Sequence, residues 1–121
     1  MASDTYHEPI ELLTPETIDL HRAIRSLMEE LEAVDWYQQR VDATSDLELK
    51  RILGHNRDEE IEHATMTLEW IRRRYPTFDR ALRTYLFQEG DIIAAEERSK
   101  GEAPRAAIER PTIGSLKGTA R

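Results

Sequence analysis

"EEIEHATMTLEWI", residues 59–71, begins with three carboxylates and an imidazole and continues into apolar side chains. Its polar and apolar residues recur at steps of three and four, the spacing of a helix face. One stripe through the segment holds Leu53, Asn56, Glu60, His63, Thr67 and Trp70. A second, apolar stripe holds Ile61, Ala64, Leu68 and Ile71. The stretch therefore predicts a helix with two faces to bury, one of which carries Glu60 and His63.

A first long helix is predicted before it, from about residue 15 to about residue 42. Thr14 is suited to cap this helix, and Pro15 to occupy its first position. The stripe that faces a partner carries one acid, Glu30, set between apolar residues. A carboxylate in such surroundings usually takes up a proton, meets a cation or binds metal.

The helix of residues 59–71 forms the second arm of an antiparallel hairpin. Thr44 or Ser45 is expected to cap it, and Pro76 to end it. A shorter third helix is predicted after Pro76, with Gly90 as its stop. Whether this third helix extends into the following "DIIAAEE" stays open.

The charge of the chain changes sign near residue 97. Residues 1–97 carry 22 acidic and 11 basic side chains, whereas residues 98–121 carry 2 acidic and 6 basic ones. We expect residues 1–97 to form one helical domain, and residues 98–121, which are rich in glycine and proline, to form a flexible tail. The acidic body repels nucleic-acid phosphates and attracts cations, so no nucleic-acid partner is expected.

Two absences narrow the classes of function. The chain has no cysteine, which excludes thiolate zinc sites and ordinary iron–sulfur clusters, so a metal would be held by oxygen and imidazole nitrogen. No run of about 18 apolar residues and no secretory signal pattern is present, so no membrane partner is expected. The predicted location is the cytoplasm, or a compartment within it.

The chain carries half of the ligand set of a known class of metal site, namely Glu30, Glu60 and His63. In di-iron carboxylate bundles, two helices each give one Glu and the other two each give a Glu-x-x-His pair. Two hairpins around a two-fold axis would complete that set in a four-helix bundle, so the site would require a dimer. Taken singly, each residue has a plainer explanation: the acids reach solvent from the margin of the core, and the histidine is hydrogen-bonded to a neighbour.

Three stretches together resemble a known family. They are "MEELEAVDWYQQRVDA" at 28–43, "HNRDEEIEHATMTLEW" at 55–70 and "LRTYLFQEG" at 82–90. They resemble the encapsulated ferritins, half-length ferritin-like proteins carried inside encapsulin shells. The resemblance extends over about residues 7–97.

The resemblance implies ferroxidase activity at a di-iron centre shared between two chains, with two iron ions per dimer interface, in an annular decamer. It implies Glu30, Glu60 and His63 as ligands and Tyr37 beside the centre. It also implies an outer metal site on the approach path, formed by Glu29, Glu32 and Trp36. Solvated acids and packed aromatic rings would account for these outer residues equally well.

The tail contains "TIGSLKG", residues 112–118. It resembles the peptide through which encapsulin cargo docks to the inner wall of the shell, so residues 111–118 are the expected targeting segment. Ile113 and Leu116 would fill apolar pockets, and Gly114 would let the backbone lie close. An ordinary frayed terminus is the alternative.

The function expected from the sequence is thus iron oxidation by the cargo of an encapsulin nanocompartment, which stores the iron. The alternative is a non-catalytic helical adaptor that binds metal only structurally. Manganese or zinc could also occupy these ligands, because affinity alone does not select the metal. The sequence does not predict the physiological oxidant, the oligomer size beyond the dimer, or whether the outer acids promote or limit iron uptake.

Overall fold

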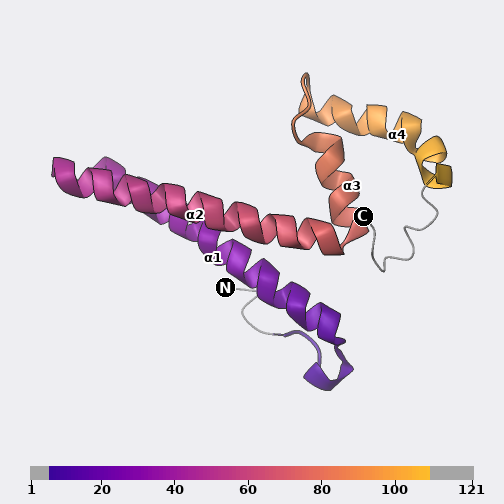
Figure 1. The fold of residues 1–121 in the computed structure, drawn as a ribbon, viewed down its shortest axis with the longest axis horizontal. Helices are drawn as coiled ribbons and strands as arrows, with labels where there is room; N and C mark the ends of the chain where they lie inside the picture. Colours follow the sequence, from indigo (N-terminus) through magenta and orange to yellow (C-terminus); the bar gives the residue numbers. More distant parts are fainter. Residues whose placement is uncertain (1–5, 110–121) are drawn as a thin grey trace. The chain divides into compact units, whose positions relative to one another are not determined.

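The computed structural model describes the backbone of residues 6–109 and the side chains of residues 6–101. All regular structure in this range is helical: the 3-10 turn η2 (Ile10–Leu12) and the helices α1 (Pro15–Ala43), α2 (Leu47–Arg74), α3 (Pro76–Tyr85) and α4 (Ile92–Glu109) (Figure 1). The prediction of an all-α fold is confirmed. None of the helices in the described range combines the length and apolar character needed to cross a lipid bilayer.

The chain forms two compact units, which divide between Glu69 and Trp70. The first contains α1 and most of α2, and the second contains the C-terminal end of α2 with α3 and α4. The expected boundary between domain and tail, near residue 97, stays a prediction. Each unit is described by itself below.

The ends of α1 and α2 follow from local hydrogen bonds. The Thr17 backbone N–H donates to Thr14 Oγ1 at 3.1 Å, and Pro15 occupies the first helical position, as predicted. The cap of α2 was predicted wrongly. It is Asp46, whose Oδ1 accepts the Leu49 N–H at 2.9 Å. A carboxylate there caps the amides and also complements the positive end of the helix dipole.

Hydrogen bonds join α1 to α2, and their partners advance in opposite directions along the two helices. They are Lys50 Nζ to the Val41 carbonyl, Arg57 Nη1 to Gln38 Oε1 at 2.6 Å, and Thr67 Oγ1 to Glu30 Oε1 at 3.1 Å. The helices therefore form the predicted antiparallel hairpin, in which they lie alongside each other (Figure 1).

The first unit buries little apolar surface. Within residues 6–69, Ala64 is the one buried apolar residue, at 6% exposure, while Leu31, Ile61 and Met66 remain 55%, 46% and 63% exposed. Two helices can bury only one stripe each against the other, and α2 carries two. The hairpin thus retains the apolar surface that a further partner would cover.

The second unit differs from the sequence prediction in two places. Helix α3 ends at Tyr85, short of Gly90, and Phe87 follows at a φ of 60° with its ring fully exposed. Gly90 lies in the loop after α3 rather than at the end of the helix. Its φ is 89°, a left-handed conformation that glycine adopts without steric cost.

The "DIIAAEE" stretch begins the separate helix α4. Asp91 caps it, since its Oδ2 accepts the Ala94 N–H at 2.9 Å. The helix continues to Glu109, so the backbone of residues 98–109, which the sequence analysis assigns to the tail, is helical. Gly101 and Pro104 lower helix propensity, but the cap at Asp91 and the surrounding alanines and glutamates favour the helix. The rest of the tail, residues 110–121, lies outside the described residues.

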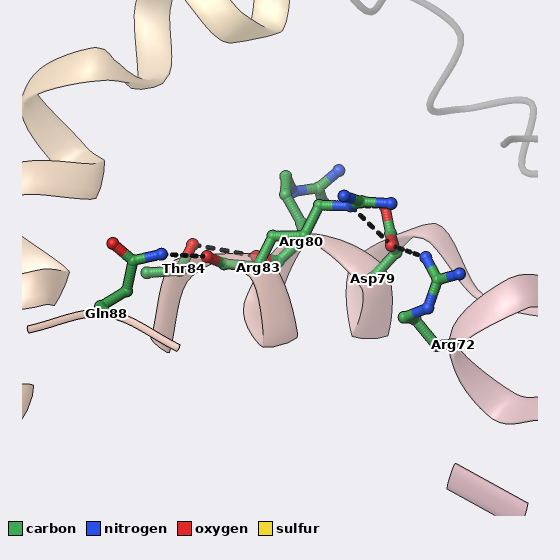
Figure 2. Close-up of polar contacts among 6 residues, drawn as sticks. All are labelled: Arg72, Asp79, Arg80, Arg83, Thr84 and Gln88. Carbon is green, nitrogen blue, oxygen red and sulfur yellow. Dashed lines mark hydrogen bonds and ion pairs between the residues drawn. The ribbon is translucent and has the colours of Figure 1, made fainter. Parts of the chain in front are cut away.

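A three-residue ion cluster joins the end of α2 to the start of α3 (Figure 2). Arg72 Nη1 donates to Asp79 Oδ1, and Arg83 Nε donates to both Asp79 oxygens at 2.9 and 3.0 Å. Burial by itself raises the pKa of the Asp79 carboxyl, but the hydrogen bonds and charges of the two arginines outweigh it and lower this pKa below 3.8. The ionised Asp79 carboxylate is therefore the form that links Arg72 of α2 to Arg83 of α3.

We expect Asp79→Asn to lower the free energy of unfolding by roughly 1–3 kcal/mol at pH 7, because the amide loses the charge-assisted bonds of a carboxylate that is only 17% exposed. Because the pKa of Asp79 is lower in the folded chain than in the unfolded chain, its ionisation stabilises the folded state above about pH 4. This contribution disappears as the pH falls through the pKa of the folded chain. Thermal melts at pH 7 and pH 3 measure both effects. Glu89→Gln, at an exposed position of the same unit, is the control. Equal melting temperatures for Asp79→Asn and the parent at pH 7 would show that the cluster adds no stability.

Candidate metal centre

The three predicted ligands lie on facing parts of the hairpin. Glu60 and His63 occupy adjacent positions on one face of α2, with His63 Nδ1 3.7 Å from Glu60 Oε1. Glu30 extends from α1 to the next turn of α2, where its Oε1 is 3.1 Å from Thr67 Oγ1. Thr67 Oγ1 is also 3.1 Å from the His63 carbonyl, so its hydroxyl can donate to either oxygen. Glu30 is thereby held one helical turn from His63.

The exposure of these side chains suits a site at a surface still to be covered. The Glu60 side chain is 26% exposed and that of His63 is 44% exposed. They lie neither in a sealed core nor fully in water, so approaching groups can reach them. Two carboxylates and an imidazole form a ligand set that suits iron, manganese or zinc.

One chain does not gather this set around a point. Among the residues whose side chains the structure describes, no three His, Asp or Glu groups are arranged to hold a metal ion. Glu30 is instead hydrogen-bonded to Thr67, and Glu60 faces His63. Within the described residues, a single hairpin therefore presents these carboxylates and the imidazole without gathering them around one point.

Tyr37 lies on α1, two turns beyond Glu30, and is partly buried. The Arg40 guanidinium carbon lies 5.3 Å from the centre of its ring, a cation–π contact. This contact orients the ring but does not link it to Glu60 or His63. Its expected place beside the centre stays a prediction.

The outer residues share α1, but the structure does not bring them together as a site. Glu29 pairs with Arg25, whose Nε lies 3.0 Å from its Oε2, and 61% of the Glu29 side chain is exposed. Glu32 is partly buried. Trp36 is 49% exposed and lines a shallow, open hollow with Gln39, Arg40 and Ala43. Metal binding at Glu29 would have to compete with Arg25, so the outer site stays a prediction.

Sequence reasoning missed two contacts of the centre. Thr67 was placed on the inward stripe without a role, yet its hydroxyl is the group that contacts Glu30. Glu59 and His55 are not among the predicted site residues, yet Glu59 lies between His55 and His63. The four-residue spacing of these three side chains was the available signal.

Comparison with known proteins gives the family. The EncFtn-like family model matches residues 5–89. The chain belongs to the EncFtn-like family. The predicted resemblance to encapsulated ferritins over about residues 7–97 is thereby confirmed.

Relatives of this family match over most of the chain. The encapsulated ferritin-like protein of Rhodospirillum rubrum is 56% identical, over 98% of this chain and 92% of the relative. The ferritin-like protein of Thermotoga maritima is 54% identical, over 82% and 87%. The encapsulin nanocompartment cargo protein EncC of Myxococcus xanthus is 36% identical, over 90% and 95%.

A crystal structure of a protein from Nitrosomonas europaea has the same fold. It superposes with a TM-score of 0.71 at 63% identity, over 74% of this chain and 98% of that one. The helical half-ferritin fold of the family therefore agrees with the hairpin described above.

Proposed function

We propose that this chain is a ferroxidase, which oxidises ferrous to ferric iron at a centre shared between two copies and acts as cargo of an encapsulin shell. One observation carries the proposal: Thr67 holds Glu30 of α1 beside the turn of α2 that bears Glu60 and His63. The printed names of the Rhodospirillum and Myxococcus relatives, which call them encapsulated or an encapsulin cargo, support the second part.

Iron is the substrate in this proposal, with two ferrous ions at each dimer interface. Glu30, Glu60 and His63 from each copy would bind them. The four carboxylates would balance the four positive charges of the two ferrous ions, and oxygen donors favour the ferric product over the ferrous substrate. Glu60 is the carboxylate that we place between the two ions, and Tyr37 is placed at the edge of the centre.

The electron balance defines what the protein must supply. Each ferrous ion loses one electron, and dioxygen that accepts two electrons and two protons leaves as hydrogen peroxide. The chain's part is to hold two ions close enough to deliver both electrons to one oxidant. Each chain would provide only two carboxylates and one imidazole, so each iron ion would keep coordination positions open for the oxidant.

A non-catalytic adaptor is the competing function, favoured by the absence of a closed ligand set within the described part of one chain. Oxygen uptake after ferrous addition to the full-length protein separates the two. The ferroxidase predicts uptake well above that of ferrous ion in buffer, with saturation as iron increases. Metal binding without added oxygen consumption would favour the adaptor.

The location follows from the same proposal. Residues 111–118, with Ile113 and Leu116, would dock to the inner wall of the shell. They lie outside the described residues, so this assignment depends on the sequence pattern. The tether would let many copies bind a curved wall, and iron would be stored in the shell rather than in the helical ring.

A further inference from the structure

The second unit carries opposite charges in two consecutive segments. Residues 70–85, which form the end of α2 and all of α3, contain five arginines and one acid, Asp79. Residues 86–97, which form the loop after α3 and the start of α4, contain four acids and no basic residue. The net charges of the two segments are therefore +4 and −4, so the segments are complementary in charge.

Two of the arginines form a pair on the surface of α3. Arg80 and Arg83 are three residues apart and extend from the same side of the helix (Figure 2). Both oxygens of Asp79 accept hydrogen bonds from Arg83 Nε, yet 65% of the Arg83 side chain is exposed. A guanidinium has five N–H donors, so Arg83 keeps donors for a further acceptor. Neighbouring like charges on a helix repel each other, and this arginine pair therefore favours an anionic partner.

Residues 86–97, called the acidic tip below, also expose apolar side chains. Phe87 is fully exposed, and Ile92 and Ile93 are 70% and 75% exposed. The φ of Phe87 is 60°, a left-handed conformation that is rare for bulky residues and is concentrated at functional sites. Exposed apolar side chains bordered by charged ones are typical of an interaction surface.

The acidic tip and the arginine pair suit each other chemically. A carboxylate accepts two parallel hydrogen bonds from one guanidinium, and an aromatic ring stacks on the same cation. Glu89 and Glu97 are exposed and would provide the carboxylates, while Phe87 would provide the ring. The tip thus has both kinds of group that an arginine surface binds.

One chain does not make this contact by itself. Among the side chains that the structure describes, no acid of the tip forms an ion pair with Arg80 or Arg83. Glu96 of the tip pairs instead with Lys100, whose Nζ is 3.6 Å from its Oε2. Both surfaces of a chain therefore stay available to a partner, and a second copy of the chain carries the complement of each.

We infer that the acidic tip of one copy docks on the arginine pair of a second copy. All residues of this contact belong to the second unit, whereas the proposed iron ligands belong to the first, so the inference does not rest on the proposed function. A centre shared between two chains would join copies in pairs. A second, separate contact would join those pairs to one another and produce species larger than a dimer.

The test is self-association of the full-length chain, measured by sedimentation velocity over a range of concentrations. A chelator in the buffer removes association through bound metal. We expect Arg80→Glu to weaken association at least about tenfold, because like charges then face each other across the contact. The double variant Glu89→Arg with Glu97→Arg should weaken it similarly. Arg80 makes no hydrogen bond to Asp79, so its replacement leaves the cluster of Arg72, Asp79 and Arg83 in place.

Mixing the two variants gives the sharper result. Each variant alone carries a tip and a surface of the same charge, whereas each complements the other at both positions. An equimolar mixture should therefore recover association to within about threefold of the parent. Arg51→Glu, at an exposed position of the first unit, makes the same charge change and should stay within about twofold of the parent. Circular dichroism checks that each variant keeps its helices.

Several results would overturn the inference. They are parental association of Arg80→Glu, an equal loss in Arg51→Glu, and a mixture that associates no better than its components. Binding of inorganic phosphate that is lost in Arg80→Glu, with association unchanged, would assign the arginine pair to a small anion instead. Iron oxidation takes no part in these measurements, so a failure of the proposed function would leave their outcome unaffected.

Discussion

Replacing Glu60 with alanine is expected to reduce the initial rate of iron oxidation by about a hundredfold or more. Loss of a group that only orients a ligand costs 10–100-fold, and Glu60 is proposed to touch both iron ions. In a two-fold symmetric centre, one substitution removes two carboxylates. The measurement is the rise of ferric absorbance after anaerobic ferrous loading and mixing with oxygenated buffer.

Glu62→Ala is the matched control for this variant. It removes the same charge two residues away on α2, at an exposed position off the stripe of Glu60 and His63. It should oxidise iron at nearly the parental rate. If Glu60→Ala matched the parent, or if both variants lost activity equally, Glu60 could not be the bridging ligand. Circular dichroism and size-exclusion chromatography must first show that both variants fold and assemble as the parent does.

Deletion of residues 111–121 is expected to abolish loading into the shell while leaving iron oxidation intact. The proposed iron ligands all lie on α1 and α2, whereas the docking contacts are assigned to Ile113 and Leu116. Buried apolar anchors at interfaces contribute about 2 kcal/mol or more each, so losing both should prevent stable capture. The measurement is the amount of this chain that co-purifies with co-expressed encapsulin shell protein.

A paired substitution localises that effect. Ile113→Ala with Leu116→Ala should reproduce most of the loss, whereas Lys117→Ala should load normally. Loading of the deleted chain at the parental level would exclude a tail-mediated mechanism. Loss of iron oxidation in the deleted chain, with its helices intact, would show that the tail also serves the metal centre.

The hairpin could be predicted because local signals agreed with the tertiary structure. Thr14, Pro15 and the three-four spacing of both long helices each have a direct physical meaning, and the structure contains the features that they predict. The cap of α2 was wrong because three neighbouring residues, Thr44 to Asp46, can all accept a hydrogen bond. Sequence gives little basis for choosing among them, and boundaries shift by one or two residues accordingly.

Helix α4 was missed over its second half for a different reason. Gly101 and Pro104 lower helix propensity, and the glycine- and proline-rich composition of residues 98–121 predicted a tail, whereas Asp91 caps a helix. A capped helix can accommodate such residues when the remainder of the segment favours helix.

The sequence predicts the proposed metal centre as a set of residues but not as a geometry. Spacing places Glu60 and His63 on one face, and the structure brings Glu30 to the same part of the hairpin through Thr67. No periodicity could indicate that Thr67 makes this contact, because its rotamer and the register between the two helices decide it. The remaining ligands would come from a second copy, and the spacing of residues within one chain does not give the position of that copy.

The central claim is that two chains share one ferroxidase centre. It is tested most directly by measuring iron bound and oxygen consumed by size-separated oligomers titrated with ferrous ion. The claim predicts that dimers and larger species bind about one iron per chain and consume oxygen, whereas monomers do neither. Monomers that bind and oxidise iron as well as the dimers would contradict it.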